Sequence, residues 1–165
     1  MFFEYLDGNV IEAAKSRGVK HVELDALYWE SGWKESALEV FQRRIEQSLA
    51  AESWVVDGNV GKVREVIWSR ADTVIWINLP LRTIRFRFFL RSFRRAITRE
   101  ELWNGCRESL KHSIFQRNSL LMWILKSHSR KQETYPLLMK DPAYSKVRFH
   151  HLRSVAEVSR LVKGL

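Results

Sequence analysis

The segment that decides the fold is residues 73–99, TVIWINLPLRTIRFRFFLRSFRRAITR. Its first part, residues 73–79, is an almost continuous apolar run, which is typical of a sheet strand covered on both faces. Pro80 ends that run, and seven arginines without any acidic residue follow between Arg82 and Arg99. We therefore expect a buried strand that leads directly into a strongly basic helix.

The predicted helix has two chemically different sides. The apolar stripe consists of Phe86, Leu90, Phe93 and Ile97, and the basic face carries Arg87, Arg91, Arg94 and Arg95. Like charges one helical turn apart repel each other unless an external anion compensates them. We expect the apolar stripe to pack against the protein and the basic face to bind phosphate or nucleic acid. The alternative is an ordinary solvated basic face whose arginine stems cover apolar surface.

Composition narrows the class of protein. A chain of 165 residues suits a single domain, and 45% hydrophobic residues with seven tryptophans exclude a disordered chain. The formal charge of +9 indicates an anionic partner without distinguishing nucleic acid, nucleotide or acidic membrane. The single Cys106 excludes an internal disulfide, and the acidic residues near Met1 argue against a signal peptide. We expect a cytoplasmic protein.

The rest of the chain alternates strand-like and helix-like segments. Strands are predicted near residues 19–24, 54–56, 73–79 and 146–152, with helical patterns between them. Such alternation predicts an α/β domain with a mainly parallel sheet, spanning residues 1–165. Within it, residues 82–135 form a predicted arginine-rich helical lid.

Two capping boxes mark predicted helix starts. Thr98 and Glu101 predict a new helical segment from Glu100, and Ser154 with Glu157 predicts the start of the last helix. A loop is predicted from Pro136 to Pro142.

Polar residues stand where two of the predicted strands end. Asp25 ends one strand, and Asp57-Gly58-Asn59 ends the next. Ligands of open parallel sheets bind at the carboxyl ends of strands, and two carboxylates opposite several arginines suit Mg²⁺ and phosphate. Taken singly, Asp57-Gly58 is also an ordinary turn dipeptide, and Asp25 an ordinary cap. The histidines and Cys106 show no zinc-binding spacing, so we predict no structural zinc site.

Five blocks of the sequence resemble a known family. They are ELDALYW (23–29), WVVDGN (54–59), ADTVIWINLPLR (71–82), RSFRR (91–95) and TREELWNGCRESL (98–110). In this order and spacing they resemble the adenylate-kinase-like branch of P-loop NTPases, whose bacterial members are often labelled topology modulation proteins. The resemblance covers roughly residues 18 to 160. It implies a three-layer P-loop kinase fold with a five-stranded parallel sheet, ATP and Mg²⁺ as ligands, and phosphoryl transfer to a small acceptor.

The resemblance also implies roles for individual residues. Asp57 would be catalytic and hold Mg²⁺ through water. Arg87 and Arg91, seven and eleven residues after Pro80, match the catalytic arginine pair that begins the lid. Further arginines of the lid would bind the nucleotide phosphates, namely Arg94, Arg95, Arg99 and Arg107. The acceptor pocket would be formed by Asp25, Tyr28, Trp29, Gly58 and Asn59.

One family motif is missing. The sequence has no G-x-x-x-x-G-K-[ST] phosphate loop, and its one Gly-Lys pair, Gly61-Lys62, has the wrong spacing. In this family the first strand lies between the third and fourth, so its loss would leave both neighbours with unpaired backbone groups. We expect residues 2–6, FFEYL, to replace it. The alternative is that the chain is the truncated product of a longer gene.

Two functions therefore compete. The first is a nucleotide or nucleoside kinase whose activity is greatly weakened or absent without the phosphate loop. The second is an inactive pseudokinase or a basic nucleic-acid-binding protein, although the large apolar residues among the arginines are expected to pack inside the domain. An amphipathic helix on a membrane surface at residues 82–97 is the least favoured reading, because the flanking elements place that helix inside the domain. We expect no membrane partner.

Overall fold

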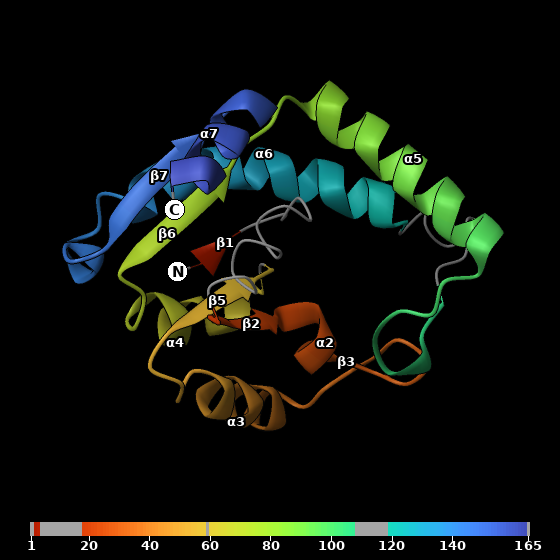
Figure 1. The fold of residues 1–165 in the computed structure, drawn as a ribbon, viewed down its shortest axis with the longest axis horizontal. Coiled ribbons are helices and arrows are strands. Elements are labelled where there is room, and N and C mark those ends of the chain that lie inside the picture. The colour runs from red at the N-terminus through yellow and green to blue at the C-terminus, as the bar shows by residue number, and fades with distance from the viewer. Residues whose placement is uncertain (1, 4–17, 59, 108–118, 165) are drawn as a thin grey trace.

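The computed structural model describes residues 2–3, 18–58, 60–107 and 119–164, which form a mixed α/β structure (Figure 1). The strands are β1 (Phe2–Phe3), β2 (Lys20–Glu23), β3 (Trp29–Glu30), β4 (Lys34–Glu35), β5 (Trp54–Asp57), β6 (Thr73–Ile77) and β7 (Arg148–Leu152). The helices are α2 (Leu24–Tyr28), α3 (Leu38–Ser48), α4 (Arg64–Trp68), α5 (Leu81–Thr98), α6 (Leu120–Leu138) and α7 (Val155–Gly164). Short 3₁₀ turns are η1 (Gly61–Val63), η2 (Trp103–Gly105) and η4 (Pro142–Tyr144). Predictions for residues 4–17, Asn59 and residues 108–118 lie outside the described residues.

The main sheet has five strands in the order β2-β5-β1-β6-β7. Every pairing within it is parallel, which confirms the prediction of a mainly parallel sheet. The short strand β1 lies at its centre, where Phe2 is in register with Val56 on one side and Val74 on the other. The start of FFEYL therefore occupies the place expected for it between β5 and β6.

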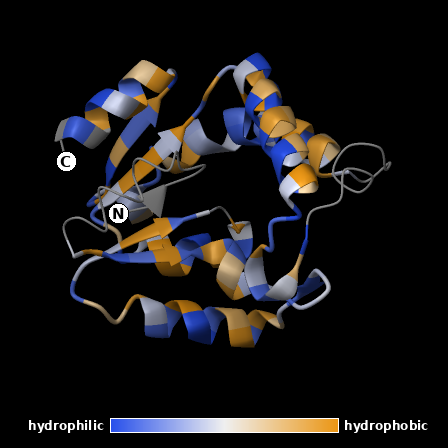
Figure 2. Ribbon diagram, turned by 45° about the vertical axis from the view of Figure 1, so that its right-hand side comes forward, coloured by the Kyte–Doolittle hydropathy of each residue, from blue (hydrophilic) through white to orange (hydrophobic). Residues whose placement is uncertain are grey.

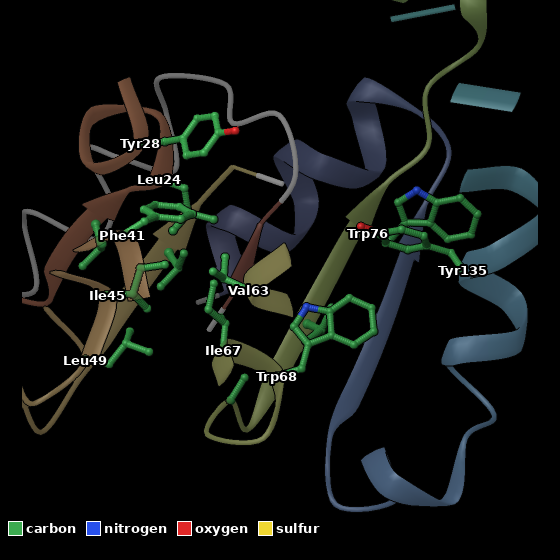
Figure 3. Packing of buried hydrophobic residues seen from close by; sticks show 14 residues of the cluster. Leu24, Tyr28, Phe41, Ile45, Leu49, Val63, Ile67, Trp68, Trp76 and Tyr135 are labelled. Atoms are coloured by element: carbon green, nitrogen blue, oxygen red, sulfur yellow. The ribbon is translucent and has the colours of Figure 1, made fainter. Parts of the chain in front are cut away.

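The core lies on both faces of this sheet, because neighbouring residues of a strand point to opposite faces. On one face, Val56, Val74 and Trp76 belong to a large cluster with residues from α3, α4 and α6 (Figure 3). On the other face, Ile75 and Ile77 pack with Val158 of α7. Strand β6 is buried along its whole length, which explains its continuous apolar sequence.

Aromatic rings join the first cluster to α6. Trp68 and Tyr135 are fully buried, and their rings meet edge to face at 5.7 Å. Trp76 lies 5.0 Å from the same tyrosine ring (Figure 3). These contacts explain why α6 continues through Pro136 to Leu138, where the sequence predicted a loop: Tyr135 anchors the last turn in the core.

The prediction for the apolar side of α5 is wrong. Phe86, Leu90, Phe93 and Ile97 are between 60% and 69% exposed, whereas Phe88 and Ser92 are the buried residues of this helix. Two helical positions turn a side chain by about 200°, so Phe86 and Leu90 point away from the side on which Phe88 packs. Figure 2 shows hydrophobic positions interleaved with hydrophilic ones along α5. Helical spacing identified the stripe but not which side of the helix the protein covers.

The two capping predictions had different outcomes. At the start of α7, the backbone N–H of Glu157 donates to Ser154 Oγ at 3.2 Å, and the Glu157 carboxylate accepts from the backbone of Arg153. The second capping box is thus confirmed. At Thr98 the prediction is wrong: its hydroxyl donates to the Arg94 carbonyl within the end of α5, and Glu101 forms an isolated antiparallel bridge with Arg107.

Across the described residues, the model contains no helix with the length and apolar character needed to cross a membrane.

Gly58 joins β5 to the turn that follows, and its backbone demands glycine. Its φ is +118°, which L side chains rarely adopt. A Cβ at this position would lie 2.9 Å from Leu24 Cβ, and Leu24 is fully buried. The turn after β5 therefore packs closely against the start of α2, next to the paired ends of β2 and β5.

We predict that Gly58→Ala destabilises the fold by about 1–3 kcal/mol, because it adds backbone strain and a contact with a core residue. Gly61→Ala is the matched control, since no atom approaches its added Cβ closer than 3.6 Å. Urea unfolding followed by circular dichroism measures both variants. Equal stabilities for the two variants would contradict this account of Gly58.

Candidate functional site

Two aspartates stand at neighbouring strand ends of the main sheet. Glu23 and Asp57, the last residues of β2 and β5, are in register, so the two strands end at the same level. Asp57 is half-buried, and Asp25 follows β2 as the second residue of α2. The predicted pair of carboxylates is therefore gathered at one edge of the sheet.

Asp25 also interacts with α5, more than sixty residues further along the chain. Burial and the neighbouring charge of Glu23 raise the pKa of Asp25, against the opposing effects of a hydrogen bond from the Trp29 side chain and the positive charge of Arg91. The structure thus brings together three predicted site residues, Asp25, Trp29 and Arg91. The positive charge of Arg91 on α5 therefore acts on the Asp25 carboxylate, although desolvation has the larger effect on its pKa.

The remaining predicted arginines fall into two groups. Arg87 and Arg99 are exposed, and Arg99 ends α5 in the left-handed conformation with φ of 49°. The others meet carboxylates that follow α5 in the sequence. Arg94 lies 3.4 Å and Arg95 4.0 Å from Glu100, and Arg107 lies 3.8 Å from Glu101. A phosphate bound by these three arginines would have to compete with the two glutamates.

Tyr28, which was predicted to line the acceptor pocket, packs mainly in the hydrophobic core. Its ring packs 5.0 Å from Phe41, and only its hydroxyl reaches the edge of the cluster (Figure 3). Lys62 lies 3.5 Å from that hydroxyl and 3.4 Å from the Glu35 carboxylate. Burial, followed by the hydrogen bond to Glu35, raises the pKa of Tyr28. Lys62 therefore interacts with this pair instead of standing in a phosphate loop.

Residues 99–107, here called the crossing segment, run from the end of α5 to the β3–β4 hairpin. Asn104 donates through its side chain to the carbonyls of Ala26 and Trp29. Trp33 donates its indole N–H to the Arg107 carbonyl at 3.2 Å and packs edge to face against Trp103. The crossing segment thereby connects the arginine helix to α2 and β3, the two elements that follow β2.

The sequence analysis did not identify Asn104 as a site residue, although the sequence indicates a turn at this position. Its φ of 52° is left-handed, a conformation in which asparagine is enriched, and the following Gly105 marks a turn. The partner carbonyls lie about seventy-five residues earlier in the chain, and no local pattern indicates them.

A second polar cluster was also missed. Asn78, directly after β6, exchanges two amide hydrogen bonds with Gln132 of α6, at 2.7 and 3.3 Å, and lies 3.0 Å from His151 Nε2. Next to it is a cavity of about 10 Å³, room for one water molecule. Its polar lining residues are Asn78, Ser127, His128 and Lys131. The rule that selected Asp25 and Asp57, a polar residue at a strand end, applies equally to Asn78.

The donor set is compatible with Mg²⁺ and phosphate. Magnesium is usually held by one or two carboxylates together with waters and substrate phosphates, and Asp57 and Asp25 are the carboxylates that could take this part at the ends of β5 and β2. Within the described ranges, no three His, Cys, Asp or Glu side chains gather as a metal-binding group. Arginine is well suited to phosphate because its planar guanidinium donates two parallel hydrogen bonds.

Comparisons with known proteins identify no relative of this chain. No family model matches the chain, and neither the curated proteins nor the solved structures contain a significant match.

The reactivity of Cys106 can be used to measure opening of the crossing segment, because it is the single cysteine of the chain and is only 2% exposed. Its thiol donates to the Glu30 carbonyl and accepts from the backbone of Trp33. We predict that Asn104→Ala speeds labelling of this thiol by a disulfide reagent by about tenfold to a hundredfold. The reason is that the variant loses the amide hydrogen bonds and disfavours the left-handed backbone.

Asn104→Gly is the matched control, since glycine keeps the left-handed backbone and removes only the side chain; we expect a smaller acceleration. Labelling of Asn104→Ala at the wild-type rate would show that these hydrogen bonds do not hold the segment.

Proposed function

We propose that the protein has a P-loop-kinase-like fold and binds the phosphate groups of Mg²⁺-ATP at the carboxyl edge of its sheet. The acceptor side of this site is formed by α2 and the turn after β5. Intact relatives of this kind would transfer a phosphoryl group to a small acceptor. In this chain we expect weak activity or none, because the sequence has no G-x-x-x-x-G-K-[ST] loop to hold the phosphates through backbone N–H groups.

The observation that carries the proposal is the strand order β2-β5-β1-β6-β7, which puts Asp57 and Asp25 at neighbouring strand ends, with Asp25 within the electrostatic influence of Arg91. In this order the first strand of the main sheet lies between the third and the fourth, as the family resemblance implies. The helix that supplies Arg91, α5, carries six arginines in all. An anion between the two aspartates and α5 would be held from the α5 side while its metal is held from the strand side.

Each side chain has a distinct task in this proposal. Asp57 would hold Mg²⁺ through water, and the ion, when bound, would neutralise charge on the phosphates. Arg87 and Arg91 would stabilise negative charge that develops during transfer, as guanidinium groups do in phosphoryl transfer enzymes. The half-buried Asp25, with its raised pKa, would accept a hydrogen bond from the acceptor.

Calorimetric titration with Mg²⁺-ATP tests this proposal. We predict measurable binding by the wild type and about tenfold to hundredfold weaker binding by Arg91→Ala, because one charge-assisted contact to phosphate contributes about 1.5–3 kcal/mol. Asp57→Asn is expected to weaken binding only when Mg²⁺ is present.

Arg85→Ala is the matched control, since Arg85 is an exposed arginine of the same helix that has no role in the proposed site. Absence of binding by the wild type would refute the proposal. An equal loss of affinity for Mg²⁺-ATP in Arg85→Ala and Arg91→Ala would mean that binding depends on the overall positive charge of the helix and not on a specific contact of Arg91.

A further inference from the structure

Helix α5 presents a continuous apolar face to solvent. Five large side chains, here called the outer face, form it, with exposed fractions of 69, 38, 62, 60 and 67% for Phe86, Phe89, Leu90, Phe93 and Ile97. They follow helical spacing, so they line one side of the helix over about three turns. Figure 1 places α5 at the periphery of the molecule, where a large partner can approach it.

Arginines border this face on both sides. Arg85 and Arg87 immediately precede and follow Phe86, so each lies about 100° from it around the helix axis, in opposite directions. Arg82 and Arg94 add charge at the two ends, and all four side chains are exposed. Helix α5 contains no acidic residue, so its outer face has a strongly positive border. A partner that binds the outer face must therefore have both an apolar region that these side chains can enter and negative charge that the arginines can contact.

We propose that the outer face of α5 docks the protein peripherally on a lipid bilayer that contains anionic lipids. The phenylalanine, leucine and isoleucine side chains enter the boundary between headgroups and acyl chains, and the bordering arginines contact the lipid phosphates. A helix with an apolar stripe between arginine borders has the chemistry of an interfacial helix. The helix lies on the membrane and does not cross it.

The composition of the outer face favours lipid over nucleic acid. Bases stack on aromatic rings, but Leu90 and Ile97 offer no π surface and are among the most exposed of the five side chains. A second copy of the chain is disfavoured because it would bring another basic helix against this one. The sequence argument against a membrane surface was that the flanking elements place the helix inside the domain, but the exposure of Phe86, Leu90 and Phe93 shows that this side of the helix faces solvent.

The inference rests on different observations from the proposed phosphate site, and Arg87 is the one bordering arginine that also has a role there. Phe88 and Ser92 are buried, and the outer face is on the opposite side of the helix. Docking through Phe86 and Phe93 therefore leaves the Asp25 side of α5 directed away from the bilayer.

Vesicle co-sedimentation of the full chain tests the proposal with two lipid mixtures, phosphatidylcholine alone and phosphatidylcholine with about one third phosphatidylserine. We expect the wild type to bind the anionic vesicles at least about tenfold more strongly than the neutral ones, and less at high salt. The variant Phe86→Gln/Leu90→Gln/Phe93→Gln should lose at least about tenfold in binding. Arg82→Gln/Arg85→Gln should lose about tenfold or more on anionic vesicles only.

Leu137→Gln is the control, because Leu137 is 72% exposed on α6, outside the outer face; it should bind like the wild type. Thermal unfolding of each variant shows whether the fold is intact, as expected for substitutions at exposed positions. No binding of the wild type to anionic vesicles, or unchanged binding of the folded triple variant, would overturn the proposal. Two other results would also overturn it if vesicle binding is absent. They are binding of a single-stranded oligonucleotide through the outer face, and self-association of the protein through the outer face.

Discussion

The structure depends on the backbone pairing of the two-residue strand β1 with both of its neighbours. Phe2 and Phe3 are in register with Val56 and Asp57 on one side and with Val74 and Ile75 on the other. Without this strand, the β2–β5 ladder and the β6–β7 ladder would each have an open edge at the centre of the sheet, with unpaired peptide groups in a buried region. With it, the carboxyl ends of all five strands form one edge, on which the proposed site is built.

Helix α5 has functional side chains on two sides, because only a narrow row of its residues packs against the rest of the protein. Phe88 and Ser92 are buried, and the small serine allows a close approach of the helix to the protein. Arg91 lies beside that row and reaches the electrostatic environment of Asp25, while the outer face remains in solvent. The crossing segment after α5 then holds the C-terminal end of this helix against α2 and β3 through Asn104. The backbone that carries these arginines is thus held by contacts of α5 and of the crossing segment, while most of the arginine side chains are exposed.

Much of the sheet was predictable from the sequence, whereas contacts between distant segments were not. Continuous or alternating apolar runs identified β2, β5, β6 and β7, and the capping box at Ser154 located α7, because these signals are local. The central position of β1 followed from the order of strands in a resembling family. The buried side of α5 was not predictable, since its apolar stripe and its packing row both have helical spacing. The partners of Asn104 and the return of Glu100 to Arg94 depend on how the chain folds back, which no local pattern records.

The central claim is that residues 2–3 hold the middle of the sheet, and nuclear Overhauser effects between backbone protons test it most directly. The structure predicts cross-strand contacts from Phe2 and Phe3 to both Val56 and Val74 in the folded protein. Direct contacts between Val56 and Val74, without any to residues 2–3, would contradict it. That result would mean that β5 and β6 pair with each other, and that the edge carrying Asp25, Asp57 and the arginines is arranged differently.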